Sequence, residues 1–588
     1  MSAHLIVVDL GFGDAGKGAT VDWLCSAEAG LGVAGVVRFN GGAQAAHNVV
    51  VDGRHHCFAQ FGAGTFSRVP TLLSRYCLVE PMALASESER LAALGVVDPL
   101  GLVAIDGDAL LTTPIHIAAN RAREDARGSS RHGSCGRGIG ETASYALEYD
   151  APRVRDCRDP VLLRAKLDQL AAHYAPLLTG SAHGFEPIDD LVRMYREFTC
   201  AVRIVDGAAE LARMVARGRV VFEGAQGVLL DEWRGFHPHT TWSTVEPRNA
   251  HALLAEVGAS GQVLGVTRAY ATRHGAGPLP TEAPLEIPEP HNGFGHYQGD
   301  FRQGHFDLVL ARYAVAACGR VDALVVNHLD AVVPDLRANR VSRNSGAADH
   351  RPGSNSVAAG SVRSAAGTEN ATPAAATCSN SAAAGTVPIA AGTDDPTPAA
   401  GTWRAAVAYS TQESGRITEL PLGTWQDLAH QQHLTDLITT AQPELHDIDG
   451  DMGAWISTSL DIPLALTAHG PTRADRRAHA ALGTAPNAES HTRSGALASP
   501  GAKSRRPTRV QVAAMADANH PIGFGDHGPA RADSRTHAAV SADQSARGST
   551  PNGRRSNRAE VKLAASPNID HPTRVRQDVA RGAIGGVH

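Results

Sequence analysis

A continuous apolar run from His4 to Leu10 opens the chain, and a glycine-rich segment from Gly11 to Gly18 follows it. The run has the length of a buried strand, and the spacing of apolar residues from Ala19 to Ala27 predicts a helix. A second apolar strand is expected from Val33 to Phe39. A strand, a glycine turn, a helix and another strand are typical of α/β proteins that bind a ligand at the turn.

The same alternation continues through most of the chain. Residues 72–120 mix short apolar strands with helical stretches, and 161–217 show the 3.6-residue spacing of packed helices. Further elements are expected as a strand at 220–230, a strand at 321–326, a hairpin at 404–420, a helix at 425–440 and a strand at 462–467. We therefore predict an α/β fold with a central, mostly parallel sheet flanked by helices.

Two long segments lack this pattern. Residues 337–402 are rich in Ala, Ser, Thr, Gly and Asn, and the sequence Ala-Ala-Gly-Thr recurs in them. The last Trp or Tyr of the chain is Trp455, so residues 481–588 have little material for a core. We expect a nucleotide-binding catalytic core at 1–336, a disordered low-complexity insertion at 337–402, the rest of the catalytic domain at 403–480, and a disordered tail at 481–588.

Charge and cysteine content narrow the function classes. The formal net charge is -6, but residues 501–588 hold 14 Lys and Arg against 7 Asp and Glu. These charges are dispersed and Phe524 is the only Phe, Tyr or Trp among them, so the tail does not favour nucleic-acid binding. The eight cysteines form no CxxC pair, which suits a reducing compartment. With no apolar run long enough for a membrane span, we expect a cytoplasmic protein without a membrane partner.

The glycine-rich segment carries the first candidate chemistry. Its backbone N–H groups and Lys17 can surround a phosphate at a helix N-terminus. Asp14 would repel such an anion unless a metal lies between them or the carboxylate takes a proton from a substrate. The spacing fits a P-loop, although Gly18 stands where a magnesium-binding Ser or Thr is usual. It also fits a dinucleotide fingerprint, with Arg38 on the 2′-phosphate of NADP, or a merely structural turn.

Other polar loops follow predicted strands. His47 ends a loop that begins at Asn40, where it could protonate a leaving phosphate, although a lone histidine is more often structural. His55 and His56 follow a turn and are expected to be exposed. A second glycine-rich loop at 133–140 carries Arg137, Gln226 lies between two glycines, and Asp330 could accept from guanine or simply cap a helix.

Taken in chain order, these motifs resemble the adenylosuccinate synthetase family, which joins IMP to aspartate with GTP. The motifs are GDAGKG at 13–18, VVRFNGG ending near His47, GRGIG at 136–140, FEGAQGVLLD at 222–231, TRHGAGPLPTE at 272–282 and NHLD at 327–330. The resemblance covers residues 4–335 and 403–475. It implies a homodimer with small-molecule substrates, and Mg²⁺ with GTP as co-substrate.

The resemblance also implies roles for individual residues. Asp14 would take the N1 proton of IMP and bind Mg²⁺, His47 would protonate the departing GDP, and Lys17 would hold the transferred phosphoryl group. The Ala46 carbonyl would complete the magnesium site. GTP or its phosphates would contact Gly13, Ala15, Gly16, Gly18, Ala46, Asn48, Arg302, His328, Leu329, Asp330 and Gly470, and IMP would contact Gln44, Ala45, Cys135, Gln226 and Thr241.

Several positions depart from the family pattern. Ala15 replaces a glutamate, Gln44 and Asn48 replace an Asn and a Thr, and Cys135 replaces a threonine. His328 replaces the guanine-binding lysine, and Tyr149 replaces an arginine that would reach the partner subunit's IMP. Asp300 stands where an arginine would hold the aspartate carboxylates, and it would repel a dicarboxylate.

The sequence therefore leaves three function classes open. The leading hypothesis is adenylosuccinate formation through a 6-phosphoryl-IMP intermediate. Within the same ligase class, a divergent paralogue could join another amino donor or another purine nucleotide. The second class is a P-loop-like NTPase, which would hydrolyse nucleotide without ligase activity. The third class, an NADP-dependent reductase, rests on the fingerprint alone.

Overall fold

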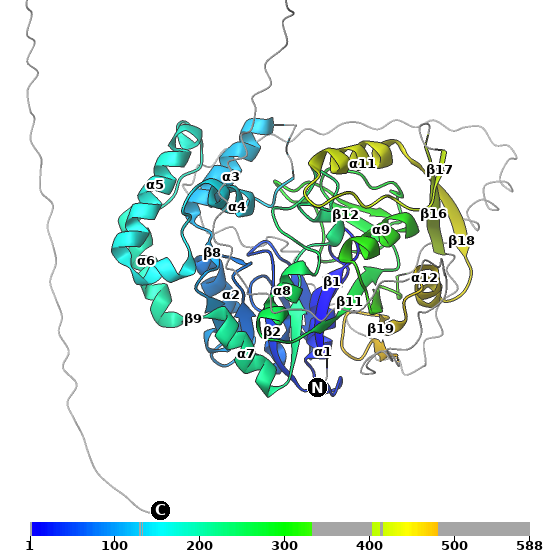
Figure 1. Ribbon diagram of the computed structural model, residues 1–588, viewed down its shortest axis with the longest axis horizontal. Helices are drawn as coiled ribbons and strands as arrows, with labels where there is room; N and C mark the ends of the chain where they lie inside the picture. The colour runs from blue at the N-terminus through cyan, green and yellow to red at the C-terminus, as the bar shows by residue number, and fades with distance from the viewer. Residues whose placement is uncertain (1–2, 129–130, 132, 332–402, 412–414, 480–588) are drawn as a thin grey trace, which may run out of the picture. The chain divides into compact units, whose positions relative to one another are not determined.

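The opening apolar run forms β1 (His4–Asp9), which lies inside a ten-stranded sheet of order β20-β19-β15-β11-β1-β10-β2-β5-β7-β9 (Figure 1). This computed structural model describes residues 3–128, 131, 133–331, 403–411 and 415–479. Every neighbouring pair in the sheet is parallel except β19 with β20. The predicted fold class is confirmed.

Parallel pairing sets the carboxyl ends of the strands along one edge. The other strands of this sheet are β2 (Val33–Arg38), β5 (Thr71–Leu73), β7 (Val103–Asp106), β9 (Arg203–Val205), β10 (Arg219–Glu223), β11 (Gly261–Arg268), β15 (Ala323–Asn327), β19 (Leu464–Ala468) and β20 (Arg476–Ala478). The predicted loops that begin at Gly11, Asn40, Gly224 and His328 follow β1, β2, β10 and β15, so the topology gathers them at a single edge, whereas the glycine-rich loop at 133–140 lies between two helices.

Helices cover both faces of the sheet. They are α1 (Lys17–Leu24), α2 (Pro81–Ala93), α3 (Pro114–Arg127), α4 (Ile139–Glu148), α5 (Pro160–Leu178), α6 (Ile188–Ala201), α7 (Gly207–Arg217), α8 (Arg248–Glu256), α9 (Leu308–Cys318), α11 (Leu428–Thr440) and α12 (Met452–Leu460). In Figure 1, α3 to α6 form a group at the left of the molecule, and α9, α11 and α12 lie at the right. None of the described helices is long and apolar enough to cross a membrane.

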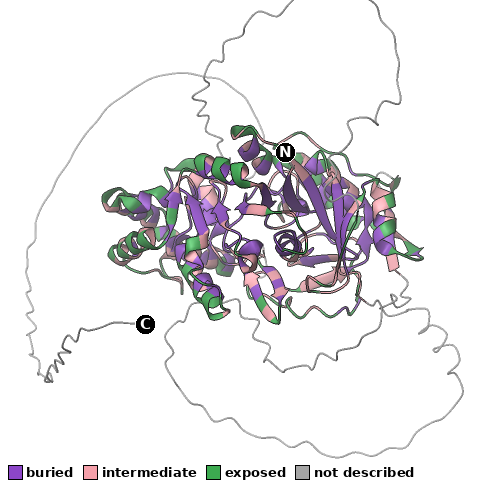
Figure 2. Ribbon diagram, turned by 90° about the horizontal axis from the view of Figure 1, so that it is seen from below, coloured by how far each residue is buried: buried purple, intermediate pink, exposed green. Residues whose placement is uncertain are grey.

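Alternate residues of β1 enter two separate cores. Ile6 and Val8 pack into one core with α8 and α9, whereas Leu5 and Val7 pack into the other with α1 and α2. Side chains of a strand alternate between the two faces, so both faces of β1 are apolar and the whole strand is buried. Figure 2 shows that the strands inside the molecule are mostly buried, whereas exposed residues gather on the outer helices.

Smaller sheets surround the large one. A four-stranded sheet contains β14 (Phe306–Asp307), β16 (Trp403–Thr411), β17 (Gly415–Ile417) and β18 (Gln442–Ile448). Two-stranded ribbons are formed by β3 (His47–Val51) with β4 (Arg54–Phe58), by β6 (Leu78–Val79) with β8 (Leu110–Leu111), and by β12 (Ala271–His274) with β13 (Phe301–Gly304). The residues before and after the predicted insertion thus share one sheet through β14 and β16.

The structure corrects several sequence predictions. The first helix begins at Lys17, two residues early, because the glycine turn closes directly onto it, and it ends at Leu24. His55 is exposed as expected, but His56 is buried against Phe58 and Phe66. Strands β9 and β18 and helix α12 were not predicted. The predicted insertion and tail lie outside the described residues, so the domain boundaries stay predictions.

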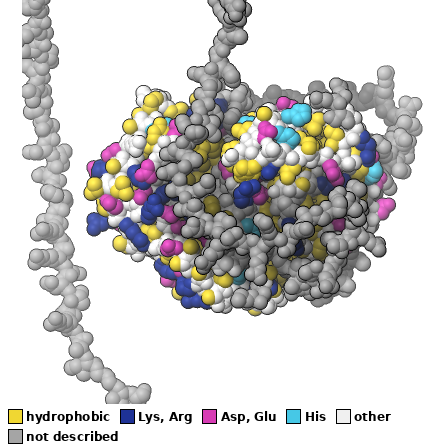
Figure 3. Space-filling model, in the orientation of Figure 1, with side chains coloured by type: hydrophobic (Ala, Val, Ile, Leu, Met, Phe, Trp, Pro, Cys, Tyr) yellow, Lys and Arg dark blue, Asp and Glu magenta, His cyan; other side chains and the backbone are white. Residues whose placement is uncertain are grey.

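The described part of the surface carries mixed charge. Figure 3 shows acidic and basic side chains interspersed with hydrophobic ones on the visible face. The exposed large hydrophobic residues include Leu147 and Val161 on the helices that flank Tyr149. Tyr149 itself stacks on Tyr145, with 4.6 Å between ring centroids.

Candidate active site

The glycine turn after β1 is organised by the Asp9 carboxylate. Asp9 accepts hydrogen bonds from the backbone N–H groups of Gly11 at 2.8 Å and Ala15 at 2.9 Å. The buried ammonium of Lys17 lies 2.9 Å from the same carboxylate. Gly13 and Gly16 have positive φ angles of 100° and 88°, which glycine adopts without a Cβ clash. Asp9 therefore closes the turn around the N-terminus of α1, and Lys17 is held rather than mobile.

The loop after β10 presses against this turn. A Cβ at Gly227 would stand 2.1 Å from the Gly11 carbonyl oxygen and 2.3 Å from the Gly13 nitrogen. Only glycine fits there, so the FEGAQG segment and the phosphate loop meet backbone to backbone. This contact brings Gln226, with a φ of 59°, beside the predicted phosphate site.

His47 is paired with a buried carboxylate that the sequence reasoning missed. Its Nδ1 lies 2.6 Å from Oε1 of Glu223, and both side chains are buried. Burial opposes ionisation of Glu223, but Arg38 and His47 hold the pKa of its carboxyl below its usual range. Burial lowers the pKa of His47, and Glu223 counters this effect. The sequence does hold one signal for this role, because Glu223 is a charged residue at the end of the otherwise apolar run at 220–222.

His47 also lies against the phosphate loop. A Cβ added at Gly18 would be 2.5 Å from the Cβ of His47, so no larger residue fits between α1 and this imidazole. Since Asp14 belongs to the same loop as Gly18, the structure gathers both candidate catalytic residues around the N-terminus of α1.

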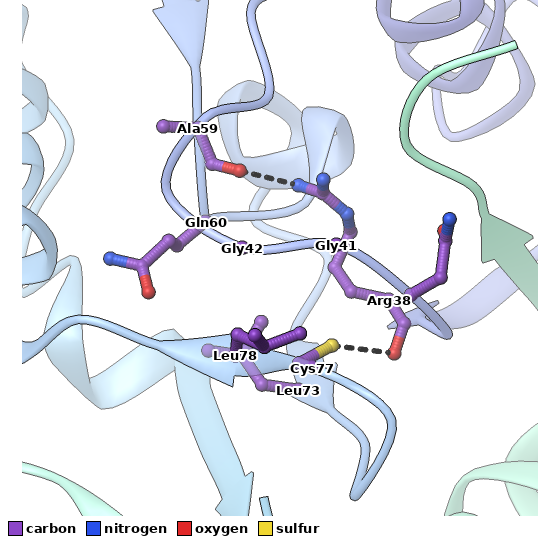
Figure 4. Close-up of a pocket in the computed structure, with 9 residues that line it drawn as sticks. Arg38, Gly41, Gly42, Ala59, Gln60, Leu73, Cys77 and Leu78 are labelled. Carbon is purple, nitrogen blue, oxygen red and sulfur yellow. Dashed lines mark hydrogen bonds between the residues drawn. The ribbon is translucent and has the colours of Figure 1, made fainter. Parts of the chain in front are cut away.

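Arg38 is unavailable to a ligand. Its guanidinium is 2% exposed and donates to the Ala59 and Phe61 carbonyls at 3.0 and 3.1 Å. Figure 4 shows it beside a small cavity behind the loop that holds Gly41 and Gly42, where the Cys77 thiol donates to the Arg38 carbonyl. The expectation that Arg38 binds a 2′-phosphate is wrong, because this side chain serves the core.

Two amide side chains converge beside the loop after β2. The side-chain nitrogen and oxygen of Gln44 and of Gln226 are buried, with no hydrogen-bond partner among the described residues. A Cβ at Gly41 would lie 3.4 Å from the Gln226 amide, and one at Gly42 would lie 3.2 Å from Gln44 Oε1. Burying an amide without a partner costs about 1–3 kcal/mol, so these groups suit a polar ligand.

Asp14 lies half-buried in the phosphate loop. It adopts the left-handed region, with a φ of 59°, and its carbonyl accepts from Arg268 Nε at 2.6 Å. Its carboxylate lies 3.4 Å from His274 Nε2.

Asp14 and Ala46 are the residues predicted to hold magnesium. The predicted donors, the Asp14 carboxylate and the Ala46 carbonyl, are hard oxygen groups of the kind that Mg²⁺ binds, and they lie on the loops after β1 and β2. Two protein donors fit Mg²⁺, which keeps waters and substrate phosphates among its ligands.

The predicted guanine residues also meet. Strands β15 and β19 are parallel neighbours, and the Leu329 N–H donates to the Ala468 carbonyl at 3.1 Å. This pairing brings His328, Leu329 and Asp330 beside Gly470. Burial lowers the pKa of His328 to about 3, so its ring is neutral and differs from the lysine it replaces.

The β12–β13 ribbon offers few free cations. Arg302 lies 2.7 Å from Glu282 Oε2 and donates to the Gly277 carbonyl at 2.7 Å. Arg273 is buried and donates to three backbone carbonyls, while Asp300 is exposed. The ribbon thus places Arg302 near the site but already paired.

The remaining predicted residues lie on several different elements. The Thr241 N–H donates to the Leu230 carbonyl at 2.8 Å, and Asn48 Oδ1 accepts from His55 Nε2 at 2.9 Å. Ala45 is buried in the loop after β2. Cys135 is half-buried between α3 and α4, near the loop of Gly133, whose added Cβ would meet the Gln298 carbonyl.

The last described residues brace the phosphate loop. Arg473 pairs with Asp22 of α1 at 2.5 Å, and Arg476 donates to Asn327 at 3.0 Å. Asn327 in turn donates to the Ala15 carbonyl at 2.6 Å. The sequence reasoning assigned no role to these residues, because their contacts span 149 to 451 positions of the chain.

Comparison with known proteins agrees with this architecture. The family model for adenylosuccinate synthetase matches residues 6–339. An adenylosuccinate synthetase of Neisseria meningitidis is 34% identical over 347 residues, which cover 56% of this chain and 77% of that protein. A fully ligated adenylosuccinate synthetase structure from Plasmodium falciparum shares the fold, with a TM-score of 0.60 at 16% identity, over 81% of this chain and 100% of that chain. The succinoaminodeoxyadenylate synthetase of cyanophage S-2L aligns less well, with a TM-score of 0.40 at 19% identity, over 59% of this chain and 89% of that chain.

The fold, the phosphate loop and the paired histidine define a nucleotide-dependent α/β enzyme, and the family match makes it a ligase that forms a C–N bond. The chain belongs to the adenylosuccinate synthetase family. GTP binding, magnesium dependence and a place in purine biosynthesis follow from that membership.

Proposed function

We propose that this protein phosphorylates the 6-oxygen of IMP with GTP and then joins aspartate at C6. The observation that carries the proposal is the buried Glu223–His47 pair, which lies against the loop that presents Asp14. A phosphate loop alone would serve an NTPase, but a carboxylate and an imidazole around one loop can move two separate protons.

The first step makes the purine oxygen nucleophilic. The Asp14 carboxylate takes the N1 proton, and the electron pair released shifts charge onto the 6-oxygen, which attacks the γ-phosphorus of GTP. The bond from that phosphorus to the β,γ-bridging oxygen breaks as GDP leaves. Mg²⁺ bound by Asp14 and the Ala46 carbonyl would neutralise charge on the phosphates. The backbone N–H groups of Gly16 and Gly18 hold the transferred group.

His47 serves the leaving group. Its low pKa keeps the ring neutral without ligand, and the negative phosphates favour the protonated form when they approach. Glu223 accepts from Nδ1, so Nε2 faces outward and can give a proton to the GDP oxygen.

The second step forms the C–N bond. The amino nitrogen of aspartate attacks C6, the C6–oxygen bond breaks, and phosphate leaves with that oxygen. The amino group loses a proton in the process, and N1 of the product purine is left without one. Gln44 and Gln226 would hold the nucleotide through amide groups that lack partners among the described residues.

A second candidate, a ligase for a different amino donor, is favoured by the β12–β13 ribbon. Arg302 is already paired with Glu282, and Asp300 adds an exposed negative charge. The two carboxylates of aspartate would therefore be bound only weakly at this ribbon. The cytoplasmic location and the homodimer remain proposals, and Tyr149 argues against completion of the site by an arginine from the partner.

Phosphate release tests both candidates in one panel. The wild type and Asp14→Asn are incubated with GTP and Mg²⁺ and with combinations of purine monophosphates and amino acids. Adenylosuccinate formation requires release that depends on IMP and aspartate together, with loss of about 10²-fold or more in Asp14→Asn. Release with another amine but not with aspartate would support the second candidate. Release without any nucleotide acceptor would contradict both.

A further inference from the structure

His274 contacts the candidate catalytic carboxylate from the β12–β13 ribbon. Its Nε2 lies 3.4 Å from Oδ2 of Asp14, and these side chains are 19% and 25% exposed. Among the described residues, it is the one side chain in ion-pair contact with this carboxylate. The approach is slightly longer than a hydrogen bond, and such contacts at active sites often tighten when substrate binds.

The ring is held on its other side. His274 pairs with Phe301 in the antiparallel ribbon, and their ring centroids are 4.7 Å apart. The Gly275 N–H donates to the Asp300 carbonyl at 2.8 Å, which fixes the backbone next to the histidine. The imidazole therefore has a defined place relative to the phosphate loop.

The buried Nδ1 indicates which nitrogen carries the proton. Nδ1 of His274 is buried and has no hydrogen-bond partner among the described residues. A buried N–H without an acceptor is costly, so the neutral ring carries its proton on Nε2, the nitrogen that faces Asp14. His274 can then donate to one lone pair of Oδ2, which leaves Oδ1 for the N1 proton and the other lone pair of Oδ2 for Mg²⁺.

Asp14 has need of such a partner. Its backbone is in the left-handed region, and Arg268 holds only its carbonyl oxygen. Arg268 is itself fixed by Tyr270 and Glu289, so the main chain of Asp14 is well anchored while its side chain can rotate. We propose that His274 is a positioning residue that orients the Asp14 carboxylate toward the N1 proton of the nucleotide. This inference rests on the proposed function.

A double-mutant cycle tests the proposal. His274→Phe keeps the ring against Phe301 but removes the donor, whereas His274→Gln restores an N–H at a similar reach. We expect kcat of His274→Phe to fall about 10–100-fold, as for outer-shell partners of catalytic groups, with KM for GTP nearly unchanged. His274→Gln should recover most of the rate. In the Asp14→Asn background, His274→Phe should have no added effect.

A matched control is His291, which lies in the segment between β12 and β13. His291 stacks on His55 with 4.3 Å between ring centroids, and His291→Phe should keep wild-type kcat. Thermal melting of each variant separates loss of fold from loss of orientation. An effect of His274→Phe that is equally large with Asn at position 14, or no effect on kcat at all, would overturn the inference alone. A wild type that releases no phosphate with any nucleotide and amine would overturn the proposed function, and the role of His274 with it.

Discussion

At the residue scale, the most informative pair is Glu223 with His47. Their 2.6 Å contact is buried, and Arg38 lies close enough to lower the pKa of Glu223. The backbone N–H of Ala63 donates to the second oxygen of the same carboxylate at 2.9 Å. Glu223 is therefore fixed at both oxygens, and its remaining task is to orient the imidazole.

Replacing Glu223 by glutamine should impair the chemistry more than nucleotide binding. The amide can turn its nitrogen toward His47 and so favour the wrong tautomer, and we expect kcat for phosphate release to fall about 10²-fold or more. The control is Glu87→Gln. Glu87 lies 3.7 Å from buried His56 and accepts from the Ala59 and Gln60 N–H groups, away from the phosphate loop. A similar loss of kcat in both variants would mean that Glu223 matters only for stability.

At the element scale, Asp307 joins α9 to the strand that resumes the chain after the predicted insertion. It accepts from the Leu310 N–H at the start of α9 and from the Tyr409 hydroxyl of β16 at 2.6 Å. Burial raises the pKa of Asp307 to about 6. The folded protein therefore binds this proton more tightly than the unfolded chain does, and the charged form costs stability.

This pKa predicts how stability should depend on pH. As pH rises from about 4 to about 6, the wild type should lose up to about 3 kcal/mol through Asp307, at 1.36 kcal/mol per pKa unit. Asp307→Asn keeps a cap and a partner for Tyr409 but cannot ionise. Urea unfolding at pH 4.5 and 7.5 should show the variant gaining on the wild type at the higher pH. An equal difference at both values would contradict the assignment.

At the scale of the whole molecule, the site is closed by residues far apart in sequence. The alternation of strands and helices along the chain, the buried strands and the loops at their carboxyl ends follow from local patterns, so the sequence predicts the α/β fold and the phosphate loop but not the order of strands in the sheet. Arg473 with Asp22, and Arg476 with Asn327, carry no local signal. His274 and Glu223 lie within the family motifs at 272–282 and 222–231, but their roles depend on which neighbour each side chain faces.

Two C-terminal truncations test whether the contacts of Arg473 and Arg476 are needed for nucleotide binding. A chain ending at residue 480 keeps β20 and the hydrogen bond from the His479 N–H to the Ala465 carbonyl, so we expect wild-type melting and phosphate release. A chain ending at residue 470 loses both arginines and should lose nucleotide binding, read by calorimetry with GTP. Loss of activity in the longer truncated chain would show that residues 481–588 contribute directly.

The close backbone contact at Gly227 limits how the two loops can evolve. Because a methyl group there would occupy the space of the Gly11 carbonyl and the Gly13 nitrogen, the two loops cannot diverge independently. A recombinant that takes one loop from a distant relative must inherit the other with it. Substrate preference can therefore drift at the ribbon that carries Asp300 while the phosphate cradle stays as it is.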